Sequence, residues 1–71
     1  MNKLAAIVHA TRASATAIDA IARISRHIRD AERVGDTAGA ALLYPQLCRA
    51  QRRYATAQAV LAANPLPGDR T

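Results

Sequence analysis

The sequence contains no Phe and no Trp, and its two Tyr are the only aromatic residues among 71. Large aromatic side chains therefore cannot supply most of a core. There is also a single cysteine, Cys48, which excludes a disulfide within one chain, and no Cys/His cluster has the spacing of a zinc site. Any core must come from aliphatic side chains and from close packing at alanine.

Long hydrophobic runs are missing as well. The longest fully apolar stretches, such as residues 4–8, reach five residues, whereas a membrane-spanning helix needs roughly 20. The sequence therefore predicts no membrane segment and no membrane partner. Because a lone cysteine is typical of a reducing compartment, we expect a cytoplasmic protein.

The chain is short enough to form only one domain, residues 1–71. In a compact protein of this mass, apolar burial would stabilise the fold by about 100 kcal/mol, and ordering the residues would cost about the same. An elongated chain would bury less. One copy is therefore predicted to be barely stable, and self-association is the expected remedy.

What the sequence has in quantity is alanine, the best helix former, at 18 positions. Residues 3–34 contain no Gly or Pro, which predicts one uninterrupted helix. Its predicted packing stripe follows a 3-4 spacing through Leu4, Ile7, Thr11, Ser14, Ile18, Ile21, Ser25 and Ile28, with Ala10, Ala17 and Ile24 beside it. Charged residues gather on the opposite side of this helix.

A turn at residues 35–36 is expected to separate this helix from a second one over residues 37–63. Gly35 can adopt the left-handed conformation that ends a helix, and Asp36 or Thr37 can cap the next. The second packing stripe passes through Leu43, Leu47, Ala50, Tyr54, Ala57 and Leu61. Pro45 removes one helical hydrogen bond, which predicts a kink or a break near residues 41–44. Residues 64–71 are expected to form a flexible tail.

Two helices joined by a short turn predict an all-α fold, an antiparallel two-helix hairpin, which is expected to dimerise into a four-helix bundle. The dimer interface is predicted on an uncharged strip that the intrachain seam does not use. Its members are Cys48, Gln51, Ala55, Ala59 and Ala62, with Tyr44 at one end. Alternatively, this alanine-rich strip is a solvated face that reflects helix propensity alone. The sequence leaves open whether two copies pack parallel or antiparallel.

Ten basic residues against five acidic ones give a net charge of +5, and nine of the ten are arginine. Two arginine groups, at residues 23–33 and 49–53, would attract an acidic protein or nucleic-acid phosphate, or would form a solvated basic face. Tyr44, a rigid aromatic before Pro45, either anchors a partner or packs locally against the turn. The predicted partner-binding residues are Tyr44, Arg23, Arg26, Arg33, Arg49 and Arg52.

No residue pattern predicts catalysis. His9 and His27 lie eighteen residues apart, about 27 Å along a helix, so they cannot share a metal ion or act as a pair. Cys48 has no histidine near enough on its helix to act as a base. We therefore expect a protein that is not an enzyme and has no catalytic residue, metal, cofactor or small-molecule substrate.

Three features together resemble a known family. They are the Ala/Arg-rich stretch of residues 10–23, the Gly-Asp turn, and the segment Leu42-Leu43-Tyr44-Pro45. This arrangement is similar to the small phage-encoded quorum-sensing anti-activator proteins. The resemblance implies a homodimer of helical hairpins in the host-cell cytoplasm that binds the DNA-binding domain of a LuxR-type transcription regulator and blocks its access to promoters. It also implies the assembly ATPase of type IV pili as a second type of target, with Tyr44 and the neighbouring basic surface as contacts.

Two main hypotheses follow. The first is a dimeric inhibitor that binds a host regulatory protein. The second is a small basic helical hairpin that binds nucleic acid, which the net charge favours, although four acidic residues between 19 and 36 interrupt the basic surface. Nucleic acid is the less favoured partner, and a structural or antitoxin-like subunit of a larger complex is a third alternative.

Overall fold

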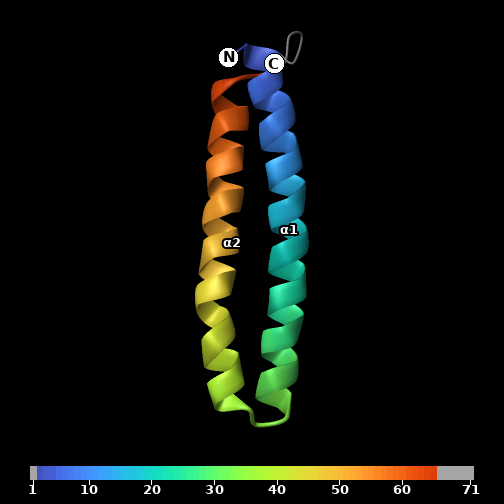
Figure 1. Cartoon of the computed structure of the whole chain (residues 1–71), viewed down its shortest axis with the longest axis vertical. Helices are drawn as coiled ribbons and strands as arrows, with labels where there is room; N and C mark the ends of the chain where they lie inside the picture. The colour runs from blue at the N-terminus through green and yellow to red at the C-terminus, as the bar shows by residue number, and fades with distance from the viewer. Residues whose placement is uncertain (1, 66–71) are drawn as a thin grey trace.

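The computed structural model describes residues 2–65, which form a hairpin of two long helices. Helix α1 (Lys3–Arg33) and helix α2 (Thr37–Ala63) pack antiparallel, side by side (Figure 1). The predicted all-α hairpin is confirmed. The molecule is a rod with extents of 50 × 25 × 14 Å, and its two helices meet along a single seam. Within residues 2–65, neither helix combines the length and apolar character that a membrane span requires.

Both helices begin at a side-chain cap. Asn2 Oδ1 accepts a hydrogen bond from the Ala5 backbone N–H at 2.7 Å, and Asp36 Oδ1 accepts one from the Gly39 N–H at 2.9 Å. Each cap satisfies one of the N–H groups that the first turn of a helix leaves without a helical partner. The predicted capping role of Asp36 is therefore confirmed.

The turn between the helices depends on Gly35, which has a φ of +78°. The Gly35 N–H donates to the Glu32 carbonyl at 3.1 Å, and the Asp36 N–H donates to the Ala31 carbonyl at 2.8 Å. These two bonds form a Schellman motif, which ends a helix at a residue in the left-handed conformation. The chain reverses here because Gly35 ends α1 and Asp36 at once begins α2.

Helix α2 is not broken at Pro45. This proline lies two residues from each of the half-buried Leu43 and Leu47, so it is on the side of α2 that faces away from α1. The carbonyl of Ala41, which loses its helical donor, belongs to an exposed residue and can be hydrated. The helix therefore continues past the proline. Of the expected tail, residues 66–71 lie outside the described residues.

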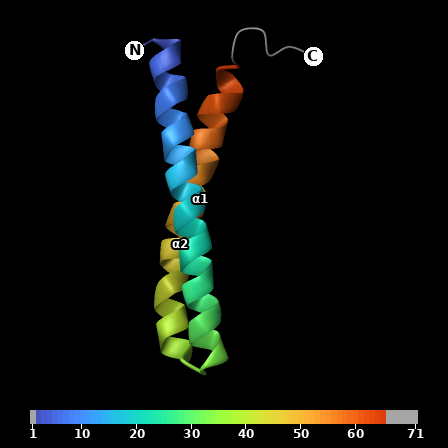
Figure 2. The same ribbon diagram turned by 90° about the vertical axis from the view of Figure 1, so that its right-hand side faces the viewer.

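The seam between the helices repeats with a 3-4 spacing on both sides. Its buried and half-buried members are Ile7, Ala10, Ser14, Ala17, Ile21, Ile24, Ile28 and Ala31 from α1, and Ala40, Leu43, Leu47, Ala50, Tyr54, Ala57, Leu61 and Asn64 from α2 and its cap. The stripe predicted for α2 is confirmed. In Figure 2 the two helices cross at a shallow inclination, as expected for a seam with a seven-residue repeat.

The stripe predicted for α1 is only half right. Every second member of it packs in the seam, but Leu4 is 64% exposed and Ile18 is 49% exposed, whereas Ala10 and Ala17 are 3% exposed. Helix α1 is therefore rotated toward its alanines. Small side chains allow two helix backbones to approach closely, and this gain in backbone packing outweighs the burial of one larger side chain such as Ile18.

Replacing Gly35 by Ala should lower the free energy of unfolding by about 1 kcal/mol, because a Cβ atom disfavours a positive φ. Asn tolerates this conformation better than Ala, so Gly35→Asn should cost less. Urea unfolding at one fixed protein concentration, followed by far-ultraviolet circular dichroism, measures both changes. Equal stability of the wild type and both variants would contradict this role for Gly35.

Candidate interaction surfaces

A two-helix hairpin has two broad faces, one on either side of the seam. The Tyr44 hydroxyl donates a hydrogen bond to Glu32 Oε2 at 2.9 Å, so these two side chains lie on the same face. Because the seam keeps a seven-residue repeat, residues seven apart remain on one face. Residues 4, 11, 18 and 25 therefore share the face of Glu32, and residues 51 and 58 share the face of Tyr44.

This first face is almost free of charge. We call it the uncharged face and define it by Leu4, Val8, Thr11, Ala15, Ile18, Ala22 and Ser25 from α1 and by Ala41, Tyr44, Cys48, Gln51, Ala55, Gln58 and Ala62 from α2. Arg29 and Glu32, next to the turn, are the charged residues at its end. Within residues 2–65, six large apolar side chains are exposed, and four of them (Leu4, Val8, Ile18 and Tyr44) lie on this face. Exposed apolar surface is thus concentrated on one side, which is typical of an interface.

The structure places four of the five predicted dimer residues, Cys48, Gln51, Ala55 and Ala62, on the uncharged face, all of them exposed. Ala59 lies two residues from both Ala57 and Leu61, on the back of α2. Sequence reasoning missed the contribution of α1 to this face because it assigned the larger apolar residues of α1 to the seam. The available signal was the second 3-4 repeat in α1 that begins at Leu4.

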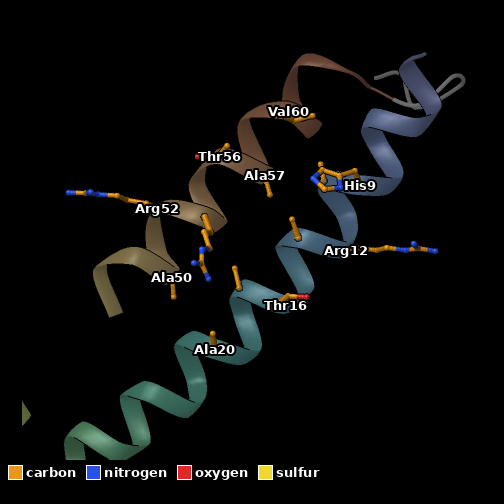
Figure 3. A pocket seen from close by; sticks show the side chains of 13 residues that line it. His9, Arg12, Thr16, Ala20, Ala50, Arg52, Thr56, Ala57 and Val60 are labelled. Atoms are coloured by element: carbon orange, nitrogen blue, oxygen red, sulfur yellow. The ribbon is translucent and has the colours of Figure 1, made fainter. Parts of the chain in front are cut away.

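The opposite broad face contains an open groove of about 500 Å³ between the two helices. Its floor consists of the seam alanines, Ala10, Ala17, Ala50 and Ala57. Its walls are His9, Ala13, Thr16 and Ala20 from α1 and Arg53, Thr56 and Val60 from α2. Arg12 and Arg52 complete the lining, and Figure 3 shows their side chains extending away from the groove on opposite sides. Sequence reasoning did not identify this groove.

The residues predicted to bind a partner do not form one cluster. Tyr44 lies on the uncharged face near the turn, whereas Arg23 and Arg49 flank the face that holds the groove. Arg26, Arg33 and Arg52 lie on the outer edges of the rod, pointing away from the seam. The Arg33 guanidinium pairs with the Asp30 carboxylate at 2.6 Å in an exposed ion pair, which contributes little to stability.

The titratable and polar side chains of the described residues are spread over the surface rather than gathered in one cluster. In the part of the chain that the structure describes, no three His, Cys, Asp or Glu residues come together as metal ligands, and no buried side-chain nitrogen or oxygen lacks a hydrogen-bond partner. The half-buried Tyr54 keeps its hydroxyl at the edge of the seam, where it accepts a hydrogen bond from Gln58 Nε2 at 2.7 Å. The two broad faces are therefore the candidate functional sites.

The hydrogen bond to Glu32 and the negative charge of that residue raise the pKa of the Tyr44 phenol above its ordinary value. A raised pKa means that this bond stabilises the fold at pH values below the pKa of an unfolded tyrosine, and that the contribution is lost as the pH rises through the folded pKa. Ultraviolet titration of Tyr54→Phe, which retains Tyr44 as its only tyrosine, should show ionisation at a higher pH than free tyrosine. Adding Glu32→Gln should lower the midpoint, and an unchanged midpoint would show that the bond does not form in solution.

The chain was compared with protein families, with curated proteins and with solved structures. No protein-family model matches the chain, and neither the curated proteins nor the solved structures give a significant match. The uncharged face and the face with the groove are therefore the basis for the functional proposal, and the resemblance to the phage anti-activators remains a prediction.

Proposed function

We propose that this protein is a small protein-binding inhibitor that acts as a homodimer. The observation that carries the proposal is the uncharged face, which spans both helices. Its residues recur at 3-4 spacing along α1 and along α2, separately from the residues of the seam. A solvated helix face normally carries charged residues, as the remaining faces of α1 and α2 do. An uncharged surface of this length instead favours contact with another macromolecule.

The exposed area supports a second copy as the occupant of this face. The chain exposes 5409 Å², about 1,100 Å² more than a compact protein of its mass. Its radius of gyration is 16.0 Å, against about 11 Å for a compact chain of this length. Two copies that each buried this excess would form an interface of about 2,200 Å², within the range of obligate homodimers.

The distribution of side-chain sizes favours one arrangement of the two copies. On the uncharged face α1 carries three of the four exposed large apolar side chains, Leu4, Val8 and Ile18. Helix α2 contributes the alanines of this face nearest to them along the rod, Ala55 and Ala62. A two-fold axis parallel to the rod would set α1 of one copy against α2 of the other, so that large side chains meet small ones. All neighbouring helices would then be antiparallel, as in a four-helix bundle.

In such a dimer the arginines on the outer edges and on the groove side would stay exposed. A basic, non-catalytic surface of this kind suits an acidic region of a regulatory protein. The resemblance to phage anti-activators makes the DNA-binding domain of a host LuxR-type regulator the first target, and the type IV pilus assembly ATPase the second. Binding would block access of the regulator to its promoters.

Nucleic acid is the second candidate partner, and one observation favours it. The lining of the groove includes three arginines, Arg12, Arg52 and Arg53, and no acidic residue. If phosphates bind there, affinity should fall steeply as the salt concentration rises. The alanine floor of the groove offers no hydrogen-bond donor to a phosphate or a base, so we place this hypothesis second.

Sedimentation equilibrium at micromolar concentration should give twice the chain mass of 7.6 kDa. Ile18→Arg should raise the dimer dissociation constant by at least about 100-fold, because it places an unpaired charge in the interface. Ile18 is already 49% exposed in one copy, so the hairpin itself should tolerate the change. Leu42→Arg is the matched control, since Leu42 is 74% exposed and lies outside the uncharged face.

A pull-down from a nuclease-treated bacterial host lysate tests the inhibitor role. We expect stoichiometric capture of a transcription regulator, which should then fail to bind its promoter DNA in a mobility-shift assay. Tyr44→Ala should reduce this capture while the dimer persists in sedimentation. Recovery of nucleic acid alone, in the absence of nuclease treatment, would contradict the proposal.

A further inference from the structure

We propose that the groove receives an amphipathic α-helix of the partner protein, with an apolar side that enters the groove and acidic residues along both of its flanks. This inference rests on the proposed protein-binding function and specifies which kind of segment is bound. It concerns the face opposite to the proposed dimer interface. Each copy in a dimer would therefore keep its own open groove.

The shape of the groove fits a helix. Its α1 wall extends from His9 to Ala20, about 17 Å or three helical turns. The floor alanines Ala10 and Ala57 are 3% and 4% exposed, so the two helices are closely packed beneath the groove. The surface open to a ligand is supplied mainly by the walls, which include the half-buried Ala13, Ala20 and Val60. A volume of about 500 Å³ lies within the range of sites that bind apolar groups. A helix laid lengthwise can fill it with large side chains spaced three and four residues apart.

The groove exists because small residues occupy the positions of α1 that flank the seam on this side. Ala13 and Ala20 are seven residues apart on α1, where larger side chains would cover the alanine floor. On α2 the corresponding flank carries Arg53 and Val60, also seven residues apart. The apolar surface left between them is concave and has no partner within the described chain.

The charges around the groove define the chemistry of its occupant. Arg12 and Arg52 extend from its two outer sides, on α1 and α2 respectively (Figure 3), and Arg53 lines the α2 wall. No acidic residue lines the groove. Guanidinium groups form bidentate pairs with carboxylates, so a bound helix with Glu or Asp on both flanks would meet a cation on each side.

The same charges disfavour two other occupants. A second copy docked groove to groove would add its own arginines to the interface and no acidic residue from the groove lining to pair with them, which opposes association. Nucleic acid would use the arginines but would leave the apolar walls of the groove, at Ala13, Ala20 and Val60, without a partner. An acidic amphipathic helix uses both the apolar walls and the arginines.

The test uses the purified full chain and two synthetic fluorescein-labelled peptides of about 18 residues, long enough to span three turns. The first contains Leu at 3-4 spacing, Glu on both flanks of this stripe, and Ala elsewhere. The second has Lys in place of every Glu. Fluorescence anisotropy should show that the acidic peptide binds with a dissociation constant at least about tenfold lower than that of the basic peptide.

Two variants with the same change in net charge locate the binding site. Thr56→Glu places a carboxylate in the groove wall and should weaken binding of the acidic peptide by at least about tenfold. Ala38→Glu places it on an exposed residue beside the turn, away from the groove, and should change binding by less than about twofold. Thr56 is exposed, so neither variant should disturb the hairpin, and circular dichroism checks this.

Equal affinity for the two peptides, or equal weakening in the two variants, would overturn the inference. Dissociation of the dimer in Thr56→Glu would assign the groove to a second copy, and displacement of the peptide by a duplex RNA would assign it to nucleic acid. A dimer that binds no acidic peptide would refute the groove inference and leave the dimer proposal standing. A monomer that binds the acidic peptide would refute the dimer proposal and leave the groove inference standing.

Discussion

The close approach of two helices at alanine is the constraint on which the rest of this structure depends. Ala10 and Ala17 on α1, with Ala50 and Ala57 on α2, are all at most 4% exposed. They are too small to separate the helices, so at these positions packing is made largely between backbones and Cβ atoms, while larger side chains such as Ile7 and Ile28 pack between them along the seam. With no Phe or Trp in the chain, and no large side chain buried completely among residues 2–65, this narrow seam provides the core of a single copy.

Both candidate surfaces are consequences of that seam. Rotating α1 toward its alanines turns Ile18 and Leu4 outward, and this supplies the apolar part of the uncharged face. The same alanines form the floor of the groove on the other side. One packing choice therefore creates an uncharged surface suited to another copy and a grooved surface whose lining includes three arginines.

Much of the fold could be predicted from the sequence because it depends on local chemistry. Gly35 and Asp36 identify the turn, and the stripe of α2 has no competing stripe of similar hydrophobicity. On α1 the predicted apolar side contains both Ile18 and Ala17, and periodicity does not show which of two adjacent stripes is at the centre of the seam; the structure buries Ala17 and leaves Ile18 half exposed. The groove and the separation of Tyr44 from the arginines depend on which flanks of the two helices share a face, which periodicity along one helix does not reveal.

The central claim is that a single hairpin leaves too much apolar surface exposed to be the working form. Thermal unfolding measured over a hundredfold range of protein concentration tests it most directly, because the stability of a dimer that unfolds to separate chains depends on concentration. The account predicts a melting temperature that rises steadily with concentration. A cooperative transition at a constant temperature over the whole range, from a species of 7.6 kDa, would contradict it.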